Sequence, residues 1–264
     1  ADNYNNADHF DASWDWKYAS TPMVADVLAI QSIYGVNNTT RTGDSTYGFN
    51  VSADVSGRDM YNFALNTGPV IAIWDAGGTD TLDVSGWAQT YHQLIDLRDG
   101  NYSNIGAMTQ NVAIAIGAVI ENAIGGNGND TIYGNDANNS INGGLGGDTI
   151  YGSIGSDTLD GDGGDDVVIY SYDISAFLVT LVDSVTVTLQ HIIDSWVDTI
   201  TEIENFIFNS TEYTFDDIAA LDASMGNILF KFGWSGGLDK VWSTESGTET
   251  YTAADMGING QSGN

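Results

Sequence analysis

Five consecutive nine-residue blocks at residues 125–169 constrain the fold of this chain more than any other stretch. They read GGNGNDTIY, GNDANNSIN, GGLGGDTIY, GSIGSDTLD and GDGGDDVVI, with no insertion between them. A flexible glycine-rich linker has no reason to keep an aliphatic residue at every ninth place. Each block nevertheless has one at its eighth position, and the stretch therefore predicts a repeated structural unit: Ile132, Ile141, Ile150, Leu159 and Val168.

Each block predicts a tight turn of six residues followed by a very short strand. The glycines supply backbone angles that are closed to other residues, and the single aliphatic side chain of the strand points inward. Two blocks then make one coil, and stacked coils form a parallel β-roll. Carbonyl and carboxylate oxygens in the turns are the ligands that calcium prefers. The pattern GGxGxDxUx, with U aliphatic, resembles the nonapeptide calcium repeat of the RTX proteins.

Loops two blocks apart are predicted to share each calcium ion, because two blocks make one coil. Loop 125–130 would pair with 143–148, loop 134–139 with 152–157, and loop 143–148 with 161–166. The predicted carboxylate ligands are Asp130, Asp148, Asp157 and Asp166. The predicted carbonyl ligands are Gly126, Gly128, Gly144, Gly146 and Gly155. Asn139 replaces a carboxylate by a neutral amide, so its site should be weaker unless Asp136 compensates.

The charge of the chain is extreme. Its 264 residues include 36 Asp and Glu against 6 Lys and Arg, a formal net charge of −30. Nucleic-acid binding is excluded, because a phosphate backbone needs a basic surface, and so is attraction to anionic membranes. Bound divalent cations would relieve the self-repulsion. The chain has no cysteine, so disulfides and thiolate metal sites are absent. We find no signal peptide at its start and no apolar run long enough to span a membrane.

Outside the repeats, the sequence predicts a mainly β protein with one N-terminal helix. A hydroxyl cap at Ser20-Thr21 followed by Pro22 favours a helix start, and the apolar pattern continues to Tyr34 before Gly35. Short β segments with turns follow, including 59–65 and 112–120. After Tyr170 the repeat pattern ends, and residues 177–193 are rich in β-branched residues. The expected fold is a parallel β-roll flanked by β-sandwich-like strands.

Four segments upstream of and entering the repeats resemble the serralysins, which are secreted bacterial zinc metalloproteases of the metzincin type. They are YASTPMVADVLAIQSIYG (18–35), RTGDSTYGFN (41–50), WDAGGTDTLDVSG (74–86) and VIENAIGGNGND (119–130). In that family, segments in this order follow the protease domain. The resemblance implies three parts: 1–36 as the end of a protease domain with one helix, 37–170 as a serralysin-like RTX β-roll, and 171–264 as a β-rich cap or binding subdomain.

The same resemblance implies further calcium where RTGDS meets WDAGGTD. One set of ligands would be Arg41 and Gly43 through their carbonyls with Ser45, Asp75, Gly77 and Asp80. A second would combine Gly78 and Asp80 with Glu121. Independently of the resemblance, DAGGTD is a loop with two glycines between carboxylates, which suits calcium.

The zinc motif of the serralysins is missing. They carry HExxHxxGxxH and a methionine turn, whereas the histidines here are His9, His92 and His191, far apart, with no HExxH. We therefore expect neither zinc nor peptide cleavage by this chain alone.

The leading hypothesis is a secreted, extracellular, non-catalytic module with several calcium ions, which folds on secretion and supports a serralysin-type protease domain or its autoproteolytic fragment. The alternative is a stand-alone secreted RTX adhesion or carbohydrate-binding protein that uses 171–264. A third possibility, an active metalloprotease, would need a catalytic segment elsewhere.

Overall fold

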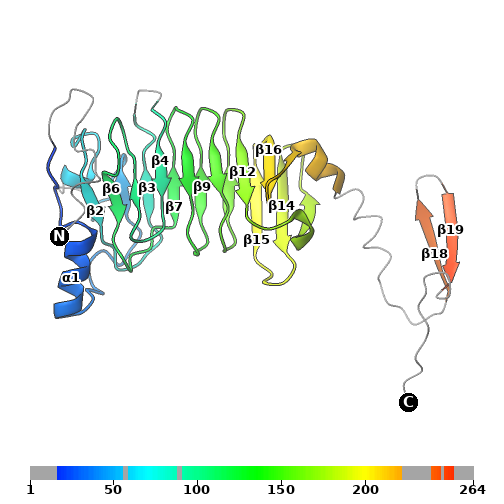
Figure 1. Ribbon diagram of the computed structural model, residues 1–264, viewed down its shortest axis with the longest axis horizontal. Coiled ribbons are helices and arrows are strands. Elements are labelled where there is room, and N and C mark those ends of the chain that lie inside the picture. The colour runs from blue at the N-terminus through cyan, green and yellow to red at the C-terminus, as the bar shows by residue number, and fades with distance from the viewer. Residues whose placement is uncertain (1–16, 56–58, 88–90, 222–238, 245–246, 253–264) are drawn as a thin grey trace, which may run out of the picture.

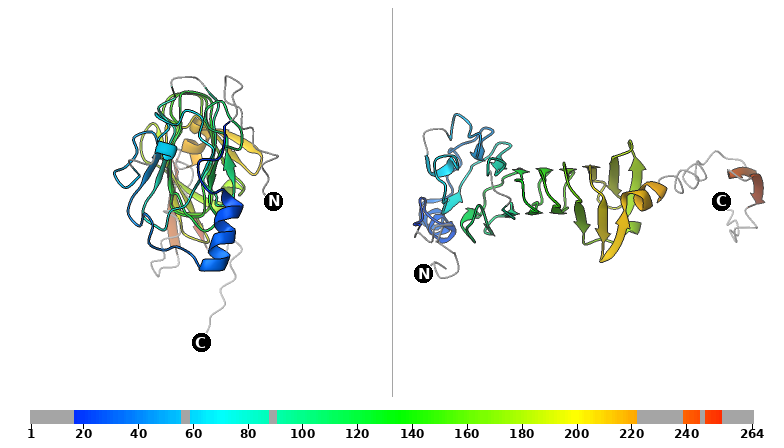
Figure 2. Two further views of the ribbon diagram at one scale, coloured as in Figure 1. Left: turned by 90° about the vertical axis from the view of Figure 1, so that its left-hand side faces the viewer. Right: turned by 90° about the horizontal axis from the view of Figure 1, so that it is seen from above.

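The computed structural model describes residues 17–55, 59–87, 91–221, 239–244 and 247–252. Residues 17–221 form an elongated body in which short strands follow one another along the long axis (Figure 1). Seen from above, the strands of the central part lie in two rows on either side of that axis (Figure 2). The predictions for residues 1–16, including the position of His9, lie outside the described residues.

One row is an eight-stranded sheet whose first six strands are parallel neighbours. Its spatial order is β1 (Thr46–Gly48), β3 (Thr81–Asp83), β7 (Asn122–Ile124), β9 (Ser140–Asn142), β11 (Thr158–Asp160), β15 (Val197–Thr201), β14 (Thr186–His191) and β13 (Phe177–Leu181). The other row is a six-stranded sheet in the order β17 (Thr211–Thr214), β16 (Asn205–Phe208), β12 (Val167–Tyr170), β10 (Thr149–Tyr151), β8 (Thr131–Tyr133) and β4 (Leu94–Asp96).

The register of these strands confirms the parallel β-roll. In one sheet Ile132 pairs with Ile150, and Ile150 with Val168. In the other sheet Ile141 pairs with Leu159. Each partner lies two blocks further along the chain, so two blocks make one coil, as the spacing predicts. Successive blocks alternate between the two sheets.

The hydrophobic core runs between the two sheets. All five aliphatic residues at the eighth position of the blocks are 0–1% exposed. Because each strand has only three or four residues, it contributes one such side chain, worth about 1.5–3 kcal/mol when fully buried. The roll is therefore stabilised by two facing columns of stacked aliphatic side chains, one on each sheet, together with the contacts of its turns.

Before the repeats, a small three-stranded sheet and a helix extend the roll. The sheet has the order β2 (Ile71–Ile73), β6 (Val112–Ile114) and β5 (Tyr102–Ser103). The helix α1 spans Val24–Tyr34 and ends at Gly35, whose φ of 84° suits glycine. The predicted helix is confirmed, but its predicted hydroxyl cap is wrong, because Thr21 Oγ1 accepts a 2.8 Å hydrogen bond from the Ala72 amide and so ties the chain to β2.

Two further expectations differ from the structure. Residues 59–65 were expected as a strand, but Asp59–Tyr61 is a short 3-10 helix and turns follow it. The side chains of Tyr61 and Phe63 are buried there, so the alternating apolar pattern reflects packing of a turn onto the core. Residues 112–120 contain only the strand β6, because the chain turns at Gly117 (φ 88°).

The sheets of the roll continue past residue 170. After β12 the chain forms a second short 3-10 helix (Ile174–Ala176) and the antiparallel hairpin β13–β14. Then β15 pairs parallel with β11, and β16 pairs parallel with β12. Residues 215–221 are helical, and Ile218 from this helix is fully buried in the core of the roll. The strands β18 (Asp239–Thr244) and β19 (Gly247–Thr252) form a separate antiparallel hairpin.

Candidate metal centre

A row of carboxylates connects the turns on one side of the roll. The amide of Gln93 donates to Oδ1 of Asp130 at 2.7 Å, and the amide of Asp130 donates to Oδ1 of Asp148 at 2.7 Å. The amide of Asp148 in turn donates to Asp166, and the amide of Asp166 donates to Oε2 of Glu204 at 2.8 Å. Each carboxylate therefore accepts a hydrogen bond from the backbone amide of the preceding coil through only one of its two oxygens.

A second row on the other side follows the same rule. The amide of Asp80 donates to Oε2 of Glu121 at 2.7 Å. Further along, the amide of Asn139 donates to Oδ1 of Asp157 at 2.8 Å, and the amide of Asp157 donates to Oδ1 of Asp198 at 2.9 Å. The parallel register brings sixth-position residues of successive coils into line, which explains why the two rows form.

Three of these carboxylates keep one oxygen buried and without a donor. Oδ2 of Asp80, Asp148 and Asp166 has no hydrogen-bond partner within the described part of the chain, and all three residues are 0% exposed. In Asp130, by contrast, Oδ2 accepts a 2.7 Å hydrogen bond from the Gly126 amide. A buried charged oxygen without a partner is costly. These three positions therefore fit a hard cation better than any other described residues.

Burial raises the pKa of four carboxyl groups in the two rows. It raises the pKa of Asp80, Asp148 and Asp157 to about 7 and that of Asp166 to about 6. For Asp148 the neighbouring carboxylates Asp130 and Asp166 raise the pKa further. The rows thus hold several negative charges close together out of water, which is an arrangement that a divalent cation would stabilise.

Glycine is required where successive turns touch. Gly146 has φ 120°, and a Cβ there would stand 2.5 Å from the carbonyl oxygen of Gly128. Gly144 has φ 98°, and a Cβ there would stand 2.3 Å from the carbonyl oxygen of Gly126. The carbonyl oxygen of Gly126 accepts a 2.9 Å hydrogen bond from Leu145, and that of Gly144 accepts one of 2.9 Å from Gly163. The predicted carbonyl ligands of loops 125–130 and 143–148 therefore lie against one another.

The segments predicted to form an upstream centre also meet. The Ser45 amide donates to Oδ1 of Asp80 at 2.7 Å. A Cβ on Gly78 would stand 2.6 Å from the carbonyl oxygen of Gly43. Asp75 accepts hydrogen bonds from the Gly77 amide at 3.1 Å and from the Tyr47 hydroxyl at 2.5 Å, so both of its oxygens have a donor.

Arg41 places a positive charge beside this upstream centre. Its Nε lies 3.7 Å from Asp75 Oδ2, and its guanidinium also donates to the carbonyl oxygen of Trp74. It sits near the rings of Tyr47 and Tyr61, at 5.5 and 5.3 Å from their centroids. Its side chain therefore neutralises part of the local negative charge, while the predicted ligand role concerns its backbone carbonyl.

The loop 134–139 differs from the others. Asn139 Oδ1 accepts a 2.8 Å hydrogen bond from the Asn135 amide, and its Nδ2 donates to the Glu121 carbonyl at 2.9 Å. Asp136 is exposed on the surface of the loop. Gly155, in the facing loop, has φ 132° and lies against Ala137. This loop satisfies its own polar groups, so it has the least need for a cation.

Two members of the rows, Asp198 and Glu204, were not predicted from the sequence. Asp198 is the first residue of a DTI triplet, and the same triplet starts at Asp130 and at Asp148. That triplet was the available signal, but it stands after the hairpin and outside the unbroken repeat. Glu204 has its own signal, because IENFI (203–207) repeats the pattern of IENAI (120–124). Glu204 accepts the Asp166 amide just as Glu121 accepts the Asp80 amide. Asp198 also differs chemically, since its Oδ2 accepts a 2.5 Å hydrogen bond from the Tyr170 hydroxyl.

No three His, Cys, Asp or Glu side chains converge on one point in the part of the chain that the structure describes. Carboxylates occur once per turn in each row, so most ligands of any ion would have to be backbone oxygens. Such a donor set suits calcium, which takes six to eight oxygens including carbonyls. None of the described helices is long and apolar enough to cross a membrane.

These features define a parallel β-roll with carboxylate-lined turns. The chain belongs to the family described as Peptidase M10 serralysin C terminal, whose model matches residues 36–260.

Individual relatives agree with this family. A serralysin of Proteus mirabilis is 48% identical over 141 residues, which are 53% of this chain and 27% of the relative. Serralysin C of Dickeya chrysanthemi is 48% identical over 122 residues, or 46% of this chain and 24% of the relative. The metalloprotease AprA of Pseudomonas entomophila is 44% identical over 132 residues, or 50% and 26%. The chain thus spans about a quarter of the length of these relatives.

Proposed function

We propose that this chain is a calcium-binding module that folds when it is secreted and supports a serralysin-type zinc protease domain, without being catalytic itself. The observation that carries the proposal is the set of three buried carboxylate oxygens without a donor, on Asp80, Asp148 and Asp166. Family membership supports the association with a protease, because the matching family is the C-terminal part of serralysins.

Within the proposed sites, the residues divide into two roles. Asp148 and Asp166 would supply carboxylate oxygens, and Gly126, Gly128 and Gly146 would supply carbonyl oxygens from the adjoining turns. Bound calcium would provide positive charge that compensates the carboxylates and satisfies their free oxygens. Upstream, Asp80 and Glu121 would act in the same way, with the carbonyls of Arg41 and Gly43 and the residues Ser45, Asp75, Gly77 and Gly78.

Folding would then depend on calcium. Without cations, a chain of net charge −30 repels itself, and its glycine-rich turns lose much entropy on ordering. A ligand that binds only the folded state adds its binding free energy to the stability of that state. In a cytoplasm poor in calcium the roll would stay unfolded, and outside the cell, at millimolar calcium, it would fold.

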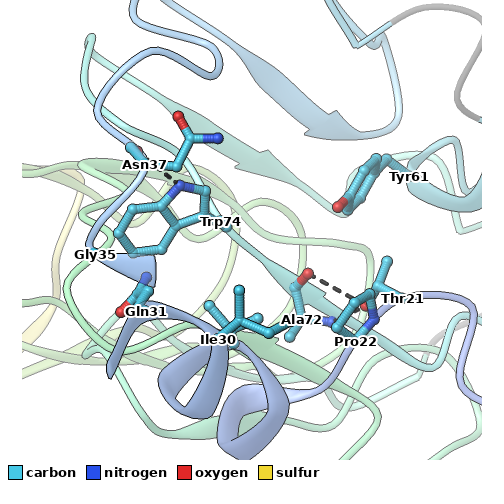
Figure 3. A pocket seen from close by; sticks show the side chains of 10 residues that line it. Thr21, Pro22, Ile30, Gln31, Gly35, Asn37, Tyr61, Ala72 and Trp74 are labelled. Carbon is cyan, nitrogen blue, oxygen red and sulfur yellow. Dashed lines mark hydrogen bonds between the residues drawn. The ribbon is translucent and has the colours of Figure 1, made fainter. Parts of the chain in front are cut away.

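The surface of α1 supports an attached domain. Leu28, Ile30, Ile33 and Tyr34, which lie in the segment whose apolar pattern predicts the helix, are 44–83% exposed. Ile30 also lines a pocket of about 210 Å³, together with Tyr61 and Trp74 (Figure 3). Contiguous exposed apolar residues mark sites of interaction. In the proposed full-length protease, the domain preceding the helix would cover this surface.

A calcium titration followed by circular dichroism tests the proposal. The chain should gain strand signal as calcium is added and lose it when a strong chelator is added, while magnesium should be much less effective. Strand content that stays the same in chelator would contradict the proposal. Asp216→Ala is the matched control for ligand substitutions, because Asp216 is acidic and exposed and belongs to neither row.

Two assays separate the remaining alternatives. We expect no cleavage of casein by this chain, with or without added zinc. Binding of the chain to polysaccharides, lost when 171–264 is removed, would instead favour the adhesion or carbohydrate-binding alternative. The family match extends to residue 260 and so favours a single protease-associated module.

A further inference from the structure

Two tyrosines on the outer face of the six-stranded sheet form a stacked pair. Tyr133 in β8 and Tyr151 in β10 both occupy the ninth position of their blocks and are register partners. Their ring centroids are 4.2 Å apart, and the ring planes differ by only 12°. Both side chains are partly exposed to solvent. The pair therefore brings two accessible phenols from successive coils into direct contact.

Neighbouring side chains hold the pair in place. The Arg98 guanidinium lies 4.5 Å from the Tyr133 ring centroid. Arg98 is fixed by hydrogen bonds of 2.8 and 2.6 Å to Asp96, which is the register partner of Tyr133 in β4. On the other side, Ile169 is the register partner of Tyr151. The rings thus occupy the middle of a column whose spacing is set by the parallel backbone.

We propose that Tyr133 and Tyr151 are a site of oxidative coupling, at which a one-electron oxidant joins the two side chains into dityrosine and ties two successive coils covalently. The chain has no cysteine, so no disulfide can provide such a link. The oxidant we specify is a haem peroxidase supplied with hydrogen peroxide.

Each phenol gives one hydrogen atom, as an electron and a proton, to the peroxidase, and the two phenoxyl radicals form a carbon–carbon bond between their ortho positions. Each ortho carbon then releases its proton while a phenoxyl oxygen takes one up from water, which restores both aromatic rings. Overall, the two tyrosines lose two hydrogen atoms, and one hydrogen peroxide is reduced to two water molecules.

The geometry favours this pair over other couplings. Tyr47 and Tyr61 are also close, at 5.4 Å, but their rings are inclined at 74° and both residues are buried. Coupling between two molecules is opposed by the net charge of −30 on each. The stacked pair should therefore react within one chain.

The test is to treat the calcium-loaded chain, at low concentration, with a haem peroxidase and limiting hydrogen peroxide. We expect a monomer that has lost two hydrogen atoms, the blue fluorescence of dityrosine, and a cross-linked peptide containing Tyr133 and Tyr151. Tyr133→Phe and Tyr151→Phe should each abolish this product while keeping a stacked ring, and circular dichroism should verify their fold. Tyr213→Phe is the matched control and should leave the product unchanged.

The absence of this cross-link in folded protein would overturn the proposal, as would its persistence in either Phe variant or equal coupling of Tyr47 with Tyr61. A second readout rests on the proposed calcium function: the coupled chain should fold at severalfold less calcium, because the link restricts the unfolded chain. The tyrosine coupling and the calcium-dependent folding can each be refuted without refuting the other. Mass spectrometry alone decides the coupling, and the untreated chain alone decides calcium dependence.

Discussion

The backbone amide of Asp148 donates a 2.6 Å hydrogen bond to Oδ1 of Asp166, one coil further along the roll, while Oδ2 of both residues stays buried without a donor. One oxygen of each carboxylate thus fixes the stacking of the coils, and the other remains available. A single residue type at the sixth position can in this way serve both the backbone and a cation.

Replacing Asp148 separates the proposed ligands from exposed acidic residues. Asp148→Ala should raise the calcium concentration needed for folding by about tenfold, which corresponds to about 1.4 kcal/mol, because a buried carboxylate would no longer face the ion. Asp216→Ala should change that midpoint by less than about twofold, since Asp216 is exposed and belongs to neither row. Titrations monitored by circular dichroism give both values. Equal effects of the two substitutions would show that Asp148 is not a ligand.

The raised carboxyl pKa values predict opposite effects of pH with and without calcium. The folded chain holds Asp148 and Asp157 at a pKa of about 7 and Asp166 at about 6, above the ordinary value of 3.8. Between these values the folded state binds more protons than the unfolded state, so its stability falls as pH rises. In chelator, the folded fraction should therefore be larger at about pH 5.5 than at about pH 7.5.

With calcium present the trend should reverse, because protons then compete with the ion for the same oxygens. The apparent calcium affinity should weaken as the pH falls through about 7 to about 6. Isothermal titration calorimetry at several pH values, in buffers of different ionisation enthalpy, would also count the protons released. An affinity independent of pH over this range would be incompatible with ligation by these carboxylates.

A methyl group at Gly146 should destabilise the roll. Gly146→Ala places a Cβ 2.5 Å from the carbonyl oxygen of Gly128, at a φ of 120° that residues with a side chain rarely adopt. We expect a loss of about 1–3 kcal/mol in the free energy of unfolding, measured by urea denaturation in calcium. Gly43→Ala is the control: a Cβ there meets no atom within 4 Å, and the proposed carbonyl ligand is retained.

The hydroxyl of Tyr170 should stabilise the far end of the roll regardless of calcium. It donates a 2.5 Å hydrogen bond to Asp198, and both residues are buried. Tyr170→Phe keeps the ring that stacks on Phe208 at 5.3 Å but leaves Asp198 Oδ2 without a donor. The expected loss is about 1–3 kcal/mol, with a lower melting temperature at saturating calcium. Tyr213→Phe should have little effect, because Tyr213 is only partly buried.

The part of the fold that could be predicted from sequence is the part where one residue type recurs at a fixed position of an uninterrupted repeat. Ile132 and its equivalents recur every nine residues because each strand buries a single side chain, so the period, the coil of two blocks and the pairing of loops followed directly. The sixth-position aspartates were found for the same reason. Where the repeat is uninterrupted, the period of the sequence gives the register of the strands directly.

Other features depend on contacts between distant segments. Thr21 does not cap the helix, because its hydroxyl accepts a hydrogen bond from the amide of Ala72, 51 positions away. The apolar pattern of residues 24–34 predicts a helix, and nothing in its spacing shows that the described chain leaves Ile33 and Tyr34 exposed. Glu204 joins the carboxylate row because the parallel pairing of the roll resumes after the hairpin β13–β14. The local pattern IENFI (203–207), which repeats IENAI (120–124), does not by itself show that pairing.

The hairpin β13–β14 has a practical consequence for protein engineering. After Tyr170 the chain forms β13 and β14, which are the last two strands at one end of the eight-stranded sheet, and the parallel pairing of the roll resumes with β15 at Val197. The junction is thus a natural insertion point. A peptide grafted between Val182 and Val185, at the exposed hairpin tip, would be displayed from a rod whose own coils need not change.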